Sequence, residues 1–171
     1  MKITKLNIPE VMILEPKVFN DERGFFYESF NQKKFLDVID RDIRFVQDNH
    51  SKSKKGVLRG LHYQIEPFSQ AKLVRVIQGE IYDVAIDLRE NSDTYGKWVS
   101  QFLSSENKYQ MWIPEGFAHG FLVMSDEAEV IYKTNNYYSV DHEKTIHWRH
   151  NSFNINWPLN HNLILTSKKD S

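Results

Sequence analysis

Short stretches of alternating apolar and polar residues run through most of the chain, and they limit its fold more than any other feature. The clearest is KLVRVIQGEIYDVAIDLR at residues 72–89, which predicts two strands around a turn at Gln78-Gly79-Glu80. Because side chains alternate between the two faces of a strand, the second strand has one apolar and one mixed face. The apolar face carries Tyr82, Val84, Ile86 and Leu88, and the other carries Asp83, Ala85 and Asp87.

Similar stretches predict further strands along the chain. They lie at residues 11–16, 109–114, 119–124 and 127–138. In the last of them Tyr132 shares a face with Val130 and Thr134. Pro114-Glu115-Gly116 forms the turn between the second and the third.

One helix is predicted near the start of the chain. Ser29 and Gln32 resemble a capping box, and Phe35, Leu36 and Ile39 follow at helical spacing. Many short strands with turns about every 8–12 residues predict an all-β protein, an antiparallel jelly roll, sandwich or barrel with a few short helices. A roomy barrel of this kind can hold a small ligand in its interior.

The composition narrows the classes of function. The 171 residues suffice for one well-buried domain, which we place at residues 1–171. A net charge of −1 gives no broad attraction to nucleic acid or to an anionic membrane, so neither is an expected partner. Cysteine is absent, which excludes disulfides and cysteine nucleophiles. No run has the apolar length of a signal peptide or a membrane span, so we expect a soluble, cytoplasmic protein.

The stretch LRGLHYQ at residues 58–64 raises the question of what His62 does. A catalytic metal needs ligands that converge at a fixed spacing, such as His-x-His on a strand. The position two after His62 is Gln64, and no His-x-His occurs in the chain, so we predict a site without a metal. His62 is then a proton-transfer group or a core histidine with a satisfied hydrogen bond. On a regular strand Arg59 points to the face opposite His62, unless Gly60 allows a bulge.

Other catalytic arrangements find little support in the residues. Asp83 and Asp87 share a strand face, but four strand residues separate them by about 13 Å, too far for the carboxylate pair of a glycosidase. No P-loop or serine nucleophile elbow occurs. Taken alone, Tyr132 is a core tyrosine with its hydroxyl at the edge, and SKKD at residues 167–170 is a charged tail.

Six motifs taken together resemble a known family. They are FNDERGFFYESF, FVQDNHSKSKKGVLRGLHYQ, KLVRVIQGEIYDVAIDLR, WIPEGFAHGFLVMSD, YKTNNYYS and SKKD. In this order, over nearly the whole chain, they are similar to the dTDP-4-dehydrorhamnose 3,5-epimerases. The resemblance implies a cupin-like jelly roll that forms homodimers and needs no cofactor. It also implies action on dTDP-4-dehydro-6-deoxyglucose on the way to dTDP-rhamnose.

The resemblance further implies roles for particular residues. His62 matches the catalytic base, Asp170 the carboxylate paired with it, and Tyr132 the proton donor. Lys72 would lie near the C4 carbonyl of the sugar. The implied nucleotide-binding residues, some of which reach across the dimer, are Arg23, Phe26 and Glu28. The remaining implied substrate contacts are Gln47, Asn49, Arg59, His119, Glu143 and Lys169.

Three departures from the family pattern stand out. Ala71 replaces the glycine that usually precedes the lysine, and it would be strained at a positive φ. Residues 148–151 read WRHN where the family often has WNDP, so an acidic loop has become basic. The spacing from Trp157 to Asp170 is slightly longer than usual, so Asp170 is matched by its own motif.

Three alternatives remain open. The protein could be a mono-epimerase that inverts only C3 or C5 of a related nucleotide-linked 4-keto sugar. It could be a jelly roll that binds a sugar without catalysis, although that role needs neither base nor acid. A metal-dependent cupin oxygenase or isomerase is the third alternative, and the missing ligand spacing disfavours it.

Overall fold

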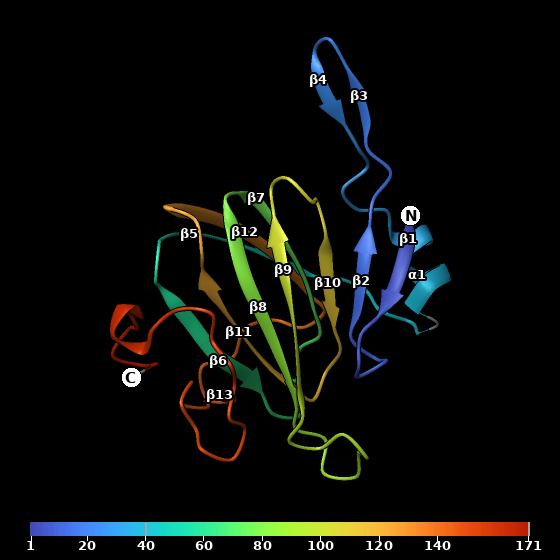
Figure 1. Ribbon diagram of the computed structural model, residues 1–171. Coiled ribbons are helices and arrows are strands. Elements are labelled where there is room, and N and C mark those ends of the chain that lie inside the picture. The colour runs from blue at the N-terminus through green and yellow to red at the C-terminus, as the bar shows by residue number, and fades with distance from the viewer. Residues whose placement is uncertain (40, 171) are drawn as a thin grey trace.

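A computed structural model of the protein describes residues 1–39 and 41–170 (Figure 1). Asp40 and Ser171, which belong to the domain predicted at residues 1–171, lie outside the described residues. The predicted all-β architecture with little helix is confirmed. The strands are β1 (Lys2–Lys5), β2 (Met12–Glu15), β3 (Phe19–Asp21), β4 (Gly24–Phe26), β5 (Gln47–Lys54), β6 (Leu58–Gln64), β7 (Lys72–Gln78), β8 (Glu80–Asp87), β9 (Trp98–Ser104), β10 (Gln110–Ile113), β11 (Phe117–Val123), β12 (Glu127–Thr134) and β13 (Glu143–Thr145). The helices are α1 (Gln32–Ile39) and the 3₁₀-helix η1 (His161–Leu163).

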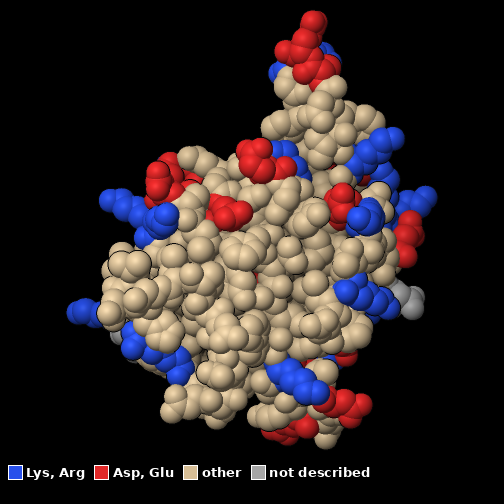
Figure 2. Space-filling model, in the orientation of Figure 1, with Lys and Arg blue, Asp and Glu red and all other residues tan. Residues whose placement is uncertain are grey.

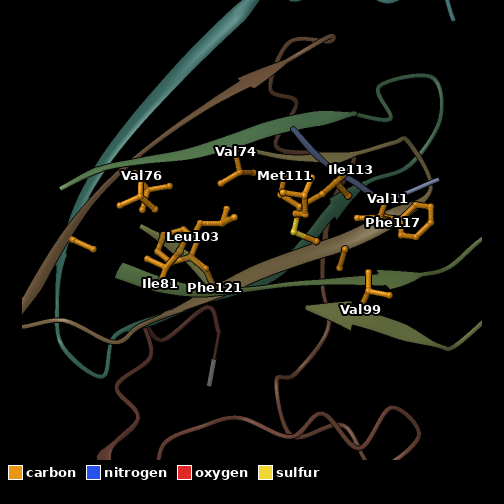
Figure 3. Packing of buried hydrophobic residues seen from close by; sticks show 14 of the residues in the cluster. Val11, Val74, Val76, Ile81, Val99, Leu103, Met111, Ile113, Phe117 and Phe121 are labelled. Atoms are coloured by element: carbon orange, nitrogen blue, oxygen red, sulfur yellow. The ribbon is translucent and has the colours of Figure 1, made fainter. Parts of the chain in front are cut away.

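Two antiparallel sheets face each other and form a β-sandwich. The six-stranded sheet has the order β1-β2-β10-β7-β12-β5, and the five-stranded sheet has the order β13-β6-β11-β8-β9. The main hydrophobic core fills the space between the two sheets, as Figure 3 shows. Val74 of β7 and Met111 of β10 extend into it from the first sheet, and Ile81 of β8 and Phe121 of β11 from the second.

The two strands predicted around Gly79 are present, but they do not pair with each other as a hairpin. β7 lies in the six-stranded sheet and β8 in the five-stranded sheet, so the chain crosses between the sheets at this residue. Gly79 has a φ of +75°, and a Cβ atom there would lie 2.1 Å from the carbonyl oxygen of Glu127. Only glycine fits such a corner. The turn at Gly116, with a φ of +84°, also carries the chain from one sheet to the other.

Both sheets are also covered on their outer faces. Phe35 of α1 packs against Trp112 on the six-stranded sheet. Trp148 and Trp157, from the chain that follows β13, cover Val84 on the five-stranded sheet. The polar face of β8 therefore points into the sandwich rather than into solvent, and its aspartates are fully buried.

The predicted helix exists, but its N-terminal cap differs from the prediction. The Asn31 side-chain oxygen accepts a hydrogen bond of 3.2 Å from the Lys34 backbone N–H. Asn31 therefore caps α1, and the capping box centred on Ser29 is wrong. Phe35 and Ile39 are buried, as their helical spacing predicts.

β3 and β4 form a two-stranded hairpin that projects from the body of the molecule (Figure 1). Its aromatic side chains are largely exposed, with Phe26 at 70%. Figure 2 shows acidic and basic side chains together at its tip and around the edge of that face, in keeping with the small net charge. Within residues 1–39 and 41–170, no helix is long and apolar enough to cross a membrane.

Candidate active site

An irregularity in β6 brings two predicted site residues to the same face. His62 pairs with His119 of β11, but Arg59 pairs with Phe121, so β6 has one residue more than β11 in this interval. The bulge lies at Gly60, whose φ is +117°. The expectation from a regular strand, that Arg59 points away from His62, is wrong, and the bulge that Gly60 allows is present.

The backbones of β6 and β11 approach closely at this bulge. A Cβ atom on Gly60 would lie 2.6 Å from the Gly120 Cα atom, and one on Gly120 would lie 2.7 Å from the carbonyl oxygen of Arg59. Neither position therefore has room for a side chain. The bulge is built from two glycines that face each other across the strand pair.

A cavity of about 580 Å³ opens between the two sheets beside this bulge. β6 and β11 form one wall, and β5, β7 and β12 form the other. The segment at residues 165–170 closes a third side. Predicted site residues at this cavity are Asn49, Arg59, His62, Lys72, His119, Tyr132, Glu143, Lys169 and Asp170. A smaller pocket of about 210 Å³ adjoins it and adds Gln47.

His62 and Asp170 form a close pair at the cavity wall. His62 Nε2 lies 2.6 Å from Asp170 Oδ1, although 108 residues separate the two in sequence. Asp170 is 4% exposed, and its second oxygen accepts a hydrogen bond of 3.0 Å from the Ser167 hydroxyl. Burial lowers the pKa of His62 below its ordinary value of 6.5, and Asp170 offsets part of that shift. The imidazole is therefore neutral at neutral pH and can accept a proton.

Lys72 is a buried cation next to this pair. It is 7% exposed, and its Nζ atom donates a hydrogen bond of 3.4 Å to the carbonyl oxygen of His62. Burial lowers the pKa of Lys72 to about 8, although the charges of Asp83 and Glu143 raise it. The side chain is mainly protonated at neutral pH and presents a positive charge to a ligand.

Tyr132 reaches the cavity from the opposite sheet. It lies on β12, next to Asn49 of β5, and packs partly against the main core. Burial raises the pKa of Tyr132, and the Arg59 charge offsets part of the shift. The phenol therefore keeps its proton at neutral pH, as a proton donor requires.

A second histidine–aspartate pair lies deeper in the same wall. His119 Nε2 is 2.6 Å from Asp83 Oδ1, and the side chains are 6% and 0% exposed. The other carboxylate oxygen of Asp83 has no hydrogen-bond partner among the described residues. This pair holds His119 rigidly at the cavity, and the charge of Asp83 supports the charge of Lys72.

Polar contacts at the cavity join Tyr138, Glu143 and Lys169. The Tyr138 hydroxyl donates a hydrogen bond of 2.7 Å to Glu143, which also forms an ion pair with Lys169. Burial raises the pKa of Glu143, but the contacts with Lys169 and Tyr138 outweigh it and keep this pKa below its ordinary value. Gln47 donates a hydrogen bond of 3.0 Å to the Asn49 side chain.

Three predicted site residues lie away from the cavity. Arg23 is at the tip of the projecting hairpin, where it forms an ion pair of 2.5 Å with Asp21. Phe26 lies on β4 of the same hairpin, and Glu28 follows it and pairs with Lys34 at 2.7 Å. Within one chain the structure does not bring these residues to the cavity that His62 lines.

Sequence reasoning missed residues that line the cavity or bond to a residue that does. The sequence gives Asp83 no role beyond the rejected glycosidase pair, and it gives Ser51 none. The Ser51 hydroxyl is buried and has no partner among the described residues. Ser53 was also missed, and its hydroxyl accepts a hydrogen bond of 2.9 Å from Arg59 Nε. Alternation along β5 places both serines on the face of Asn49, which was the available signal.

Two of the departures from the family pattern, at Ala71 and in the WRHN loop, can be examined in the structure. Ala71 is fully buried, and its φ is not positive, so the strain expected there is absent. Its backbone N–H donates a hydrogen bond of 2.7 Å to the Asn135 side chain. In the WRHN loop, Arg149 lies over the ring of the buried Trp148. Nothing in the structure explains why this loop is basic.

Among residues 1–39 and 41–170, no three of the histidine, aspartate and glutamate side chains are grouped as metal ligands would be. The prediction of a metal-free enzyme stays a prediction, because it concerns activity.

The sequence of the chain matches known proteins over almost its whole length. A family model described as dTDP-4-dehydrorhamnose 3,5-epimerase matches residues 5–171. The dTDP-4-dehydrorhamnose 3,5-epimerase of Shigella flexneri is 62% identical over 170 residues, which cover 99% of this chain and 93% of that protein.

Solved structures agree with the sequence match. One is the crystal structure of dTDP-6-deoxy-D-glucose-3,5-epimerase RmlC from Legionella pneumophila Philadelphia 1, in complex with dTDP-4-keto-L-rhamnose. It matches with a TM-score of 0.95 and 50% sequence identity, and the match covers 99% of this chain and 89% of that chain. Another is the crystal structure of dTDP-4-dehydrorhamnose 3,5-epimerase from Bacillus anthracis str. Ames, with TDP and PPi bound. It matches with a TM-score of 0.93 and 42% sequence identity, and the match covers 99% of this chain and 95% of that chain. The cupin-like fold expected from the motifs is thus confirmed. The chain belongs to the dTDP-4-dehydrorhamnose 3,5-epimerase family.

Proposed function

We propose that this chain inverts C3 and C5 of dTDP-4-dehydro-6-deoxy-D-glucose, with His62 as the base and Tyr132 as the acid. The product is dTDP-4-dehydro-L-rhamnose, and the activity is that of the family, an isomerase of dTDP-rhamnose biosynthesis. One observation carries the proposal: His62 and Tyr132 line one cavity from two facing sheets. A sugar ring bound between them turns one face toward the base and the other toward the acid.

The C4 ketone of the substrate makes this chemistry accessible. It acidifies the protons on C3 and C5, and removal of either gives an enolate whose charge gathers on the C4 oxygen. A buried cation near that oxygen stabilises the transition state more than the ground state. Lys72 is such a cation, and it neighbours His62. The reaction itself requires no redox cofactor and no metal.

The two catalytic residues have the protonation states that inversion requires. His62 is neutral and can take the proton, and Asp170 orients the ring and stabilises the imidazolium that forms. Tyr132 keeps its proton and can return one to the opposite face of the enolate. Asp83 fixes the orientation of His119, which we assign to substrate binding.

The nucleotide requires local cations because the net charge of the chain is near zero. We assign the diphosphate to Arg59 at the cavity and to Arg23 on the projecting hairpin. Arg23, Phe26 and Glu28 lie away from the cavity of their own chain, which supports a homodimer in which the hairpin of one subunit reaches the site of the other. One epimerase domain over residues 1–171, the homodimer and the cytoplasmic location stay predictions.

Solvent exchange tests this function directly. The purified protein is incubated with dTDP-4-dehydro-6-deoxy-D-glucose in deuterated water with a chelator, and C3 and C5 are followed by NMR. We expect deuterium at both carbons together with inverted product. Deuterium at one carbon would instead indicate a mono-epimerase, and none at either would indicate a sugar-binding protein or a metal enzyme. Elemental analysis of the protein before the chelator is added separates the last two, since a stoichiometric metal whose removal abolishes activity would contradict the metal-free assignment.

A further inference from the structure

Gln64 occupies the position two after His62, where a metal-binding jelly roll would carry a second histidine, and it has other contacts. The side chain is 5% exposed. Its amide nitrogen donates hydrogen bonds of 2.6 Å to the Phe68 carbonyl and 3.1 Å to the Tyr137 carbonyl. Its amide oxygen accepts one of 2.7 Å from the Ser139 backbone N–H. All three bonds join β6 to backbone groups of two loops.

This orientation of the amide is fixed by its partners. The nitrogen faces two carbonyl oxygens, and the oxygen faces an N–H group. A flipped amide would set its oxygen against both carbonyls and its nitrogen against a donor. Buried polar groups without partners cost substantial free energy, so Gln64 and the two loops stabilise one another.

The loop that Gln64 holds carries a residue of the cavity wall. Tyr138 lies between the two loop residues that Gln64 bonds, and it lines both the cavity and the adjoining pocket. Its ring is about half exposed, and its hydroxyl reaches Glu143, whose Cα atom pairs with that of Gln64. The Tyr138 backbone N–H donates a further bond of 3.1 Å to Gln47 of β5.

We propose that Gln64 is a positioning residue that fixes the loop at residues 137–139 and so sets Tyr138 as a wall of the substrate cavity. Gln64 acts on substrate binding, whereas proton transfer belongs to its neighbour His62. The inference rests on the proposed function for its substrate and on the hydrogen bonds of Gln64 for its mechanism.

The test compares Gln64→Met with the parent. Methionine has a similar length and no amide, so the three bonds are lost while the cavity volume changes little. We expect KM to rise about tenfold and kcat for exchange at C3 and C5 to stay within about threefold. The matched control is Gln32→Met, which removes a 2.5 Å bond from a glutamine amide to the Ile43 carbonyl, away from the cavity. KM should not change in this control.

A double-mutant cycle with Tyr138→Ala separates positioning from general loosening of the fold. Tyr138→Ala should itself raise KM about tenfold, and Gln64→Met should add little more in that background. The proposal is overturned if the full effect of Gln64→Met persists without the Tyr138 ring, or if kcat falls as much as KM rises. If Gln64→Met does not fold, Tyr138→Ala and Gln64→Glu still decide the matter, because an unchanged KM in either overturns it.

Affinity for dTDP-glucose distinguishes failure of this inference from failure of the proposed function. This compound has no C4 ketone, so it binds without turnover and calorimetry can measure its Kd. If the parent fails to exchange C3 and C5, the proposed function is wrong, while a Kd raised about tenfold in Gln64→Met and not in Gln32→Met still supports the positioning role. An unchanged Kd in Gln64→Met would reject that role.

Discussion

The site contains two histidine–aspartate pairs with the same nitrogen–oxygen distance of 2.6 Å, yet their surroundings differ. The His62 side chain is 26% exposed and faces the cavity, and its partner Asp170 comes from a segment outside the two sheets. His119 and Asp83 are almost fully buried on neighbouring strands of one sheet. A group that exchanges protons with a substrate must be accessible from the cavity, whereas a group that binds a substrate needs a fixed orientation.

The largest effect should come from removal of the accessible histidine. His62→Ala removes the base, so we expect deuterium exchange at both C3 and C5 to fall at least about 10⁴-fold. His119→Ala removes a binding contact and should leave exchange measurable. NMR of the two variants under identical conditions checks this difference. Near-parent exchange in His62→Ala would show that His62 is not the base.

The carboxylate of the accessible pair should rank next. Asp170→Asn keeps the shape of the side chain but removes the charge that stabilises the imidazolium. We expect an exchange rate lower by up to about 10⁴-fold, by analogy with other histidine–aspartate pairs. Thermal unfolding should show an intact fold. Parent-like kinetics would mean that Asp170 does not act through His62.

Tyr132→Phe should separate inversion from exchange. It removes one hydroxyl and little packing. Deuterium can still enter from the His62 side, but inverted product should fall about 10²-fold or more, because the acid on the other face is lost. Stereochemistry and exchange are measured by NMR in one sample. Inverted sugar at the parent rate would show that another group is the acid.

The smallest effects should appear in the pH profile of kcat/KM, where the aspartate of each pair shifts a different limb. His62 must be neutral, so the rate rises with pH through a pKa that burial holds below 6.5. Lys72 must be charged, so the rate falls as pH rises through about 8.

Asp170 raises the pKa of His62, and Asp83 raises that of Lys72. Asp170→Asn should therefore move the acid limb to lower pH, and Asp83→Asn should move the alkaline limb to lower pH. Lys72→Arg should remove the alkaline limb, because arginine stays protonated. If Asp83→Asn leaves that limb in place, Asp83 does not act on Lys72.

Much of the strand structure could be predicted from the sequence, because alternation is a local property. The face shared by Tyr132 and Val130 follows from spacing alone, and so does the buried face of α1. Strand pairing could not be predicted in the same way. A glycine turn has the same local signal whether it closes a hairpin or carries the chain to the other sheet, so the residues around Gly79 predict two strands but not their partners.

The site shows the same limit. Spacing could identify His62 as a candidate, but its partner is 108 residues away, and only resemblance to a family suggested Asp170. The common face of Arg59 and His62 depends on a bulge that periodicity cannot locate. The pairing of Asp83 with His119 depends on the neighbouring strand, and nothing within β8 itself indicates it.

The facing glycines of β6 and β11 have a consequence for how such an enzyme can diversify. Neither Gly60 nor Gly120 can accept a side chain, so these two positions of the strand pair that carries His62 and His119 tolerate almost no mutation. The opposite wall has no such restriction at Ser51 or Asn49. A lineage that acquires a new nucleotide-sugar substrate can therefore change the wall of β5 while it inherits the two glycines unaltered. A deep mutational scan would show this as strong depletion at Gly60 and Gly120 and wider tolerance at Ser51 on the facing strand.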